Sequence, residues 1–198
     1  MLYALSLTST AFAMMNFSPV SKTIAEIYMV DDILVNACVL IFLISFIVMN
    51  FVTVQALEYS VAKTFKLCAF MIILGAWVRY AAIMMTGNFY LLMIGQGLIA
   101  IFQPFLGNAA SKVATSWFAD DERAIATTIG SLSIPLGCIM GMVTGPFFIS
   151  DRDKVHHAEG KEHVNSYMMI SAIIITIMNV GVLLFFEERP KIYPSKAA

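Results

Sequence analysis

The chain is divided by charge-free segments that are long enough to cross a lipid bilayer. A run over 67–86 contains Arg79 as its one charged residue. Five further runs contain no Asp, Glu, Lys or Arg, and they cover residues 1–21, 33–57, 88–111, 124–150 and 164–186. A helix needs about 20 apolar residues to span the hydrocarbon core, so each run predicts a transmembrane helix. Charged residues are only 13% of the chain, against about 25% in soluble domains.

These runs predict an all-α polytopic membrane protein, with one six-helix domain over residues 1–198. The expected helices are about 2–20, 33–57, 67–86, 88–115, 123–149 and 164–186, with a polar loop over 150–163 and a polar tail over 187–198. The runs do not alternate in polarity, which argues against a transmembrane barrel. The AFA at 11–13 resembles a signal-peptidase site, but no Lys or Arg precedes it. We therefore expect residues 1–20 to stay as the first helix.

Basic residues favour one face of this arrangement. The face that holds both termini carries Lys63, Lys66, Lys112, Arg123, Arg189, Lys191 and Lys196. The other face carries Lys22, Arg152, Lys154 and Lys161. The positive-inside rule then places both termini on the cytoplasmic or matrix side. The membrane in which the protein resides stays open between the plasma membrane and the mitochondrial inner membrane. The net charge of −1 gives no indication of a nucleic-acid partner.

Several spans contain polar residues that lipid would not favour. The first carries Thr10 and Asn16, and the fourth carries Gln96 and Gln103 on one stripe. Such side chains either bond to neighbouring helices or line a solute cavity, and both readings stay open. Arg79 lies inside the third span, where it is a candidate for contact with a substrate or a gate. Its alternatives are snorkelling to the interface and a structural pairing.

The fifth span has a glycine at every fourth position, at Gly137, Gly141 and Gly145. This spacing predicts a flat ridge that another helix can approach closely.

No pattern of catalytic residues indicates an enzyme, and no cofactor is expected. Three cysteines, Cys38, Cys68 and Cys138, fall inside predicted spans without disulfide or metal spacing. Histidines 156, 157 and 163 lie in the polar loop, where solvated side chains are favoured over a metal site.

The sequence resembles the N-terminal half of a major facilitator superfamily transporter, and more narrowly the feline leukaemia virus subgroup C receptor family of haem and choline/ethanolamine transporters. The resemblance rests on these segments: LGAWVRY (74–80), IGQGLIAIFQPFLGNAASKVATSWF (94–118), ERAIATTIG (122–130), LGCIMGMVTGP (136–146) and FFEERPKIYPS (185–195). It implies a cytoplasmic gating corner of acidic and basic residues at Glu58, Lys112, Asp121, Glu122 and Arg123, in which Glu58 and Arg123 would be partners. The alternative for the corner is helix capping by Asp120 and Asp121.

Two departures from the family's pattern affect the substrate site that the resemblance implies. Met14 stands where the family has an aromatic ring facing a quaternary ammonium, and methionine offers no ring face for cation–π contact. Pro135 replaces an amide in the fifth helix. The candidate cavity is therefore Thr10, Met14, Asn16, Arg79, Gln96, Gln103 and Pro135, without choline-like specificity.

The resemblance covers half of a twelve-helix transporter, whose substrate lies between two six-helix halves. The chain is therefore expected to need a partner: a second half, another copy of itself or a larger membrane complex. The chain can also be a fragment of a longer product. Two functions follow. One is a half-transporter that completes a pathway for a haem-like or organic-cation solute. The other is a non-transporting structural subunit of a larger complex, such as a respiratory one.

Overall fold

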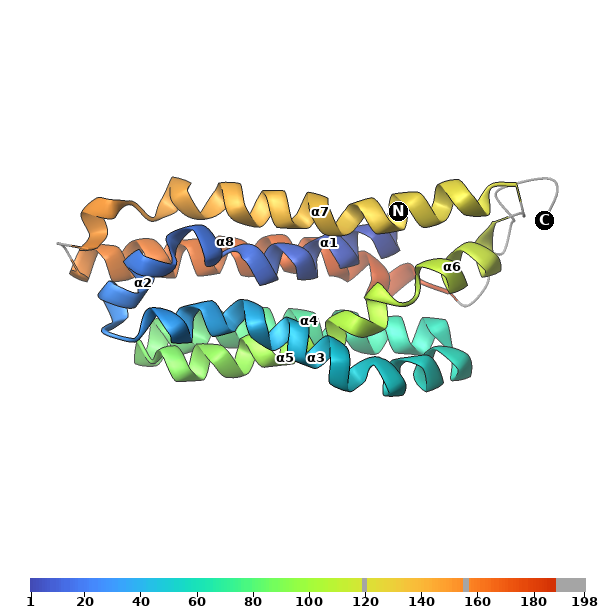
Figure 1. Ribbon diagram of the computed structural model, residues 1–198, viewed down its shortest axis with the longest axis horizontal. Helices are drawn as coiled ribbons and strands as arrows, with labels where there is room; N and C mark the ends of the chain where they lie inside the picture. The colour runs from blue at the N-terminus through green and yellow to red at the C-terminus, as the bar shows by residue number, and fades with distance from the viewer. Residues whose placement is uncertain (119–120, 155–156, 188–198) are drawn as a thin grey trace.

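The computed structural model is an elongated bundle of helices (Figure 1). It describes residues 1–118, 121–154 and 157–187, so Asp120, His156 and the basic residues of the tail lie outside the described part. The elements are α1 (Leu2–Met15), η1 (Ser18–Val20), α2 (Ser21–Tyr28), α3 (Asp32–Tyr59), α4 (Val61–Ala81), η2 (Ala82–Thr86), α5 (Phe89–Gly107), α6 (Ala110–Trp117), α7 (Arg123–Phe148), η3 (Asp151–Lys154) and α8 (His157–Phe185).

Within the described residues, five helices are long and apolar enough to cross a membrane. They are α3, α4 with η2, α5, α7 and α8. The prediction of an all-α membrane fold is confirmed. The start of α1 and the end of α8 lie towards the same end of the bundle (Figure 1).

The first expected helix is interrupted, because α1 ends at Met15 rather than near residue 20. Pro19 explains the position of the break. It has no N–H to bond the carbonyl of Met15, four residues earlier, and its ring would clash with that carbonyl. The chain then continues through the short helix η1 into α2. With 14 residues, α1 is too short by itself to count among the membrane-spanning helices.

Other boundaries also differ from those expected. The expected helix over 88–115 divides after Gly107, because Asn108 and the glycine before it favour a helix end. The third helix begins early, at Val61, because Ser60 caps it by accepting a hydrogen bond from the Lys63 backbone N–H. The expected loop over 150–163 is shorter, since α8 already begins at His157, and Ala158, Glu159, Lys161 and Glu162 in its first turns are good helix formers.

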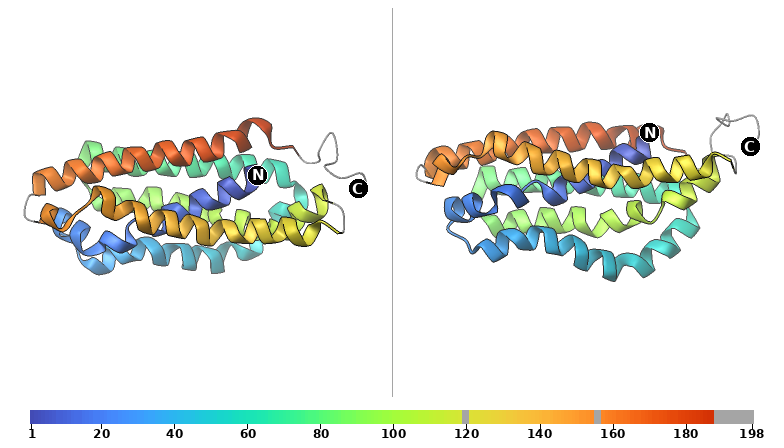
Figure 2. Two further views of the ribbon diagram at one scale, coloured as in Figure 1. Left: turned by 90° about the horizontal axis from the view of Figure 1, so that it is seen from above. Right: turned by 45° about the horizontal axis from the view of Figure 1, so that its top comes forward.

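Helix α1 is enclosed by its neighbours. It packs against α7, α8 and α5, as both views of Figure 2 show. The residues from Ser6 to Ala13 are all buried. The hydroxyl groups of this helix therefore face other helices rather than lipid, and they need partners inside the bundle.

The glycine stripe of α7 lies directly against α1. The three glycines meet successive turns of that helix, next to the backbone carbonyls of Thr8, Phe12 and Asn16. A Cβ on Gly141 would lie 2.7 Å from the Phe12 oxygen, and one on Gly145 would lie 3.0 Å from the Asn16 oxygen. A Cβ on Gly137 would come closer still to the Thr8 oxygen. The backbones touch only because these side chains are absent.

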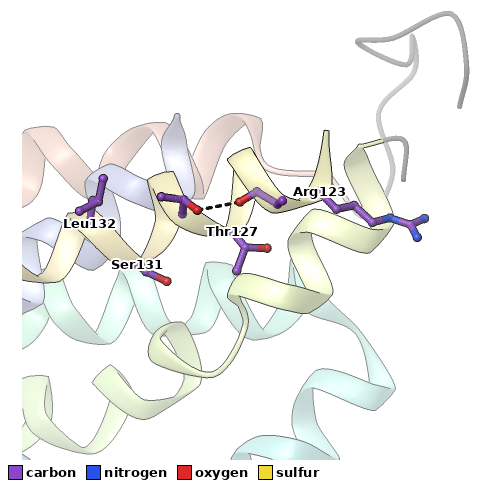
Figure 3. Close-up of a pocket in the computed structure, with 6 residues that line it drawn as sticks. Arg123, Thr127, Ser131 and Leu132 are labelled. Carbon is purple, nitrogen blue, oxygen red and sulfur yellow. Dashed lines mark hydrogen bonds between the residues drawn. The ribbon is translucent and has the colours of Figure 1, made fainter. Parts of the chain in front are cut away.

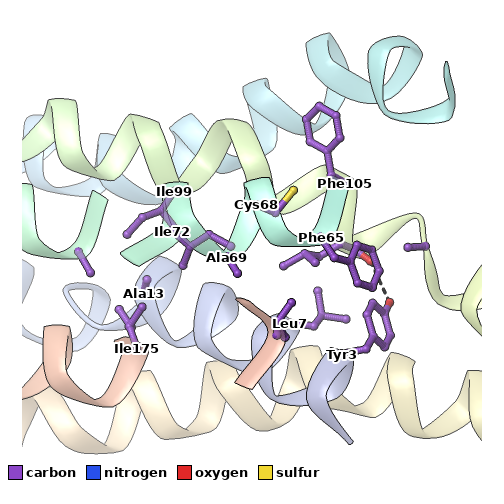
Figure 4. Packing of buried hydrophobic residues seen from close by; sticks show 14 of the residues in the cluster. Tyr3, Leu7, Ala13, Phe65, Cys68, Ala69, Ile72, Ile99, Phe105 and Ile175 are labelled. Atoms are coloured by element: carbon purple, nitrogen blue, oxygen red, sulfur yellow. Dashed lines mark hydrogen bonds between the residues drawn. The ribbon is translucent and has the colours of Figure 1, made fainter. Parts of the chain in front are cut away.

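Apolar side chains fill the space between α1, α4, α5 and α8 (Figure 4). The ring of Tyr3 stacks on Phe65 with centroids 5.4 Å apart. Its hydroxyl donates a 2.8 Å hydrogen bond to the carbonyl of Leu106, at the end of α5. This bond ties the start of α1 to the opposite layer of the bundle.

We expect Gly137→Ala to destabilise the protein by about 1–3 kcal/mol, because its new methyl group would overlap α1. Gly97→Ala is the matched control, since its Cβ would meet only Ile41 Cδ1 at an ordinary 3.4 Å. Because alanine is a better helix former than glycine by about 1 kcal/mol, a loss of stability at Gly137 would come from the contact with α1 and not from helix propensity. The measurement is the thermal unfolding midpoint in detergent, and equal effects of the two substitutions would contradict the close approach of α1 and α7.

Candidate functional site

Arg79 is buried in the interior of the bundle, with 1% of its surface exposed. Its Nη2 donates to Asn16 Oδ1 at 3.1 Å, and Met168 Sδ lies 3.8 Å from the same nitrogen. The guanidinium carbon lies 5.1 Å from the centre of the Phe17 ring. Within the described residues no Asp or Glu forms an ion pair with it. The guanidinium thus contacts neighbouring helices inside the bundle and does not snorkel.

Two local features place Arg79 there. The first is the contact of α4 with α5 at Gly75 and Gly95, where a Cβ on either would lie within 2.8 Å of the other's carbonyl oxygen. The second is the end of α1 at the Pro19 break, which leaves Asn16 next to the arginine. The hydroxyl of Tyr167, which also lies 3.1 Å from Thr144 Oγ1, donates to the Asn16 carbonyl at 3.3 Å. These contacts join α1, α4, α7 and α8.

Gln96 makes a second buried polar contact. It is fully buried, and its Nε2 donates to the carbonyls of Ala13 and Cys38 at 3.1 and 3.0 Å. The amide therefore ties α5 to α1 and α3. Thr10, also fully buried, donates to the carbonyl of Leu7 within its own helix.

The remaining candidates lie elsewhere. Met14 and Gln103 are half-buried, and Pro135 is exposed on α7. The structure therefore brings Asn16 and Arg79 into contact inside the bundle and leaves Pro135 on an outer face.

Asn179 on α8 is a buried polar residue that the sequence analysis did not single out. Its Oδ1 accepts from Ser6 at 2.5 Å, and its Nδ2 donates to Ser9 Oγ at 2.8 Å. A signal was present, because Asn179 is the one amide side chain between residues 166 and 186. A lone amide in an apolar span indicates a hydrogen-bonded partner on another helix.

The charged corner lies at the end of the bundle where α6 meets α7. Arg123 Nε donates to the carbonyl of Phe118 at 3.3 Å, and its Nη2 to that of Thr115 at 3.4 Å. These bonds satisfy carbonyls at the end of α6. Glu58 is exposed at the end of α3, and Lys112 is half-buried on α6.

In the structure, Asp121 does not cap helix α7. The N-cap residue of α7 is Glu122, and its side chain makes no capping hydrogen bond. Asp121, which the capping alternative named, lies one residue earlier and is exposed.

Helix α7 presents two exposed stripes besides its glycine ridge. One stripe is small or polar and consists of Ala124, Thr128, Ser131 and Pro135, at spacings of four, three and four. The other is large and apolar and consists of Ile125, Ile129, Leu132, Leu136, Ile139 and Val143. At 3.6 residues per turn the two stripes lie on different faces of the helix.

A pocket of about 480 Å³ lies over the first turns of the small and polar stripe (Figure 3). Its lining includes Arg123, Thr127 and Ser131. The hydroxyl of Thr128 donates to the carbonyl of Ala124 at 2.8 Å. Pro135 has no N–H, so the carbonyl of Ser131 lacks its usual helical donor. The exposed hydroxyl residues and the carbonyl of Ser131 therefore lie within about the first 12 Å of α7, a membrane-spanning helix.

The comparisons with known proteins agree with this architecture. The family model of the Major Facilitator Superfamily matches residues 3–198. The chain belongs to the major facilitator superfamily. It is thus an integral multi-pass membrane protein of a transporter family, and the resemblance inferred from the sequence is confirmed.

Three relatives of this superfamily member are longer than the chain. "Choline/ethanolamine transporter flvcr2a" of Danio rerio is 26% identical over 94% of the chain, which spans 39% of that protein. "Solute carrier family 49 member A3" of Xenopus tropicalis is 28% identical over 77% of the chain and 33% of that protein. "Uncharacterized protein B0416.5" of Caenorhabditis elegans is 45% identical over 56% of the chain and 20% of that protein. The chain therefore spans less than half the length of these curated relatives.

Among the residues that the structure describes, no three His, Cys, Asp or Glu side chains lie together where they could bind a metal ion. His163 instead lies with its Nδ1 3.0 Å from Asp153 Oδ1. Asp153 Oδ2 also accepts from the backbone N–H of Ser150. This pair joins η3 to the first turns of α8.

We expect Gln96→Leu to lower stability by about 1–2 kcal/mol, because the carbonyls of Ala13 and Cys38 lose their shared donor. Gln103→Leu is the matched control on the same helix, and its half-buried amide predicts a smaller effect. The check is the unfolding midpoint of each purified variant. An equal or larger effect at Gln103 would contradict the assignment.

Proposed function

We propose that this chain is a six-helix half of a major facilitator transporter, which forms a solute pathway together with a second six-helix half. Three observations support the proposal. The chain belongs to the superfamily, relatives that it matches are named transporters, and it spans 39% of the first of them. Transporters of this superfamily hold the substrate between two such halves.

The observation that carries the proposal is the exposed polar stripe of α7. Lipid tails offer no hydrogen bonds, so exposed hydroxyls and a free backbone carbonyl within a span are unfavourable unless they face protein or a water-filled cavity. The neighbouring stripe of large apolar residues suits lipid. We infer that α7 turns its apolar stripe to lipid and its small and polar stripe to the second half and the pathway.

The buried polar residues fit this arrangement. Gln96, Asn179, Ser6 and Ser9 form hydrogen bonds between helices of this half. Their role in the proposal is to make the half rigid, so that it can move as one body against its partner. The pathway then lies between the two halves rather than within this one.

Choline and ethanolamine are the first solutes to test, because relatives carry those substrates in their names. Met14 lies half-buried where the family resemblance implies an aromatic ring. Without a ring face, cation–π attraction worth about 0.5–2 kcal/mol is lost. The proposal therefore predicts weaker selection of a quaternary ammonium over ethanolamine.

The first experiment measures the mass and composition of the particle that contains this chain after gentle detergent extraction from its native membrane. The proposal predicts a small particle that holds a second six-helix domain, either on another polypeptide or on a longer form of this one. Co-migration with many different subunits would contradict it and favour the structural-subunit alternative.

Two phenylalanine substitutions on α7 test which stripe faces the second half. We expect Ser131→Phe to weaken association or uptake at least tenfold, because the ring would obstruct the small and polar stripe. Ile139→Phe is the matched control, since Ile139 lies on the stripe assigned to lipid and is 60% exposed. Pull-down of the second half and radiolabelled uptake are measured at equal protein levels. The opposite order of effects would overturn the assignment of the stripes.

A further inference from the structure

We propose that the group around Arg79 binds a small inorganic anion of halide size inside this half of the protein. The inference is independent of the proposed transport function. It rests on a buried cation and on hydrogen-bond donors that have no acceptor. The site joins three helices, since Asn16 follows α1, Arg79 lies on α4 and Met168 lies on α8.

The charge of Arg79 is uncompensated within the described part of the chain. Its contacts there are an amide oxygen, a thioether sulfur and an aromatic ring, none of which carries a negative charge. Arginine stays protonated in proteins. An arginine in a membrane interior pairs with an opposite charge or with polar groups, because a lone buried charge is strongly unfavourable.

Two hydrogen-bond donors at this site lack a partner. They are Arg79 Nε and Asn16 Nδ2, and each belongs to a side chain at most 1% exposed. Asn16 is bonded to Arg79 through its other amide atom. The two donors therefore call for one acceptor between them.

A water molecule could accept from these donors, but it would leave the positive charge uncompensated. A monovalent anion satisfies the donors and the charge together. Space for it depends on Met168, whose sulfur is the weakest acceptor on the guanidinium at 3.8 Å. Methionine is unbranched and adapts its rotamer easily. A halide can thus take the place of the sulfur, whereas a bulky oxyanion such as sulfate cannot.

The test is thermal unfolding of the purified full chain, or of the particle in which it is extracted, in chloride, bromide, sulfate or gluconate at equal ionic strength and pH. Because a ligand that binds only the folded state stabilises it, we expect chloride and bromide to raise the midpoint by about 3 °C over gluconate. Sulfate should give no such rise. Equal stabilisation by sulfate, or none by the halides, would overturn the proposal.

Two arginine substitutions separate this site from a general salt effect. Arg79→Met should abolish the halide shift, whereas Arg152→Met, at an exposed position in η3, should keep it. If Arg79→Met does not fold, chlorine NMR on the unaltered protein decides. Broadening of the chloride line that bromide reverses supports the site, and a line unaffected by the protein rules it out.

Discussion

The close approach of α1 and α7 is the contact on which the rest of the structure depends. Three glycines let the two backbones meet along most of α1, and a Cβ at Gly137 or Gly141 would overlap the backbone of α1. Once α1 is held there, it lies in the middle of the bundle and its hydroxyls face α8 and α7. The same contact turns the two other faces of α7 outward, so it also creates the surface that we assign to a second half.

The break in α1 has consequences at the other end of the contact. Because Pro19 stops the helix, Asn16 lies at its end, and both its side chain and its carbonyl bond to neighbouring helices. Arg79 is brought to it by the glycine contact between α4 and α5. The arginine then holds together segments that are far apart in the sequence. Its uncompensated charge is the reason to look for an anion rather than a purely structural role.

The predictions from the sequence differ in how much they depended on long-range contacts. The membrane class and the family could be predicted, because run length, charge and local motifs are properties of neighbouring residues. The environment of a polar side chain could not be predicted. Gln96 and Gln103 lie on one stripe of the same span, yet Gln96 bonds to two carbonyls from other helices while Gln103 is half-buried. Asn179 was missed although its isolation in an apolar span was a usable signal.

The sequence by itself determined that this chain forms membrane-spanning helices of a major facilitator protein, since the length of each apolar run and the family motifs depend only on the local order of residues. The breaks before Pro19 and after Gly107 were not predicted, although Pro19 and Asn108 were local signals for them. Only the tertiary structure decided that Arg79 is enclosed and that α7 carries its polar stripe on an open face. The physical reason is that a helical pattern defines which residues share a face, but packing decides what that face meets.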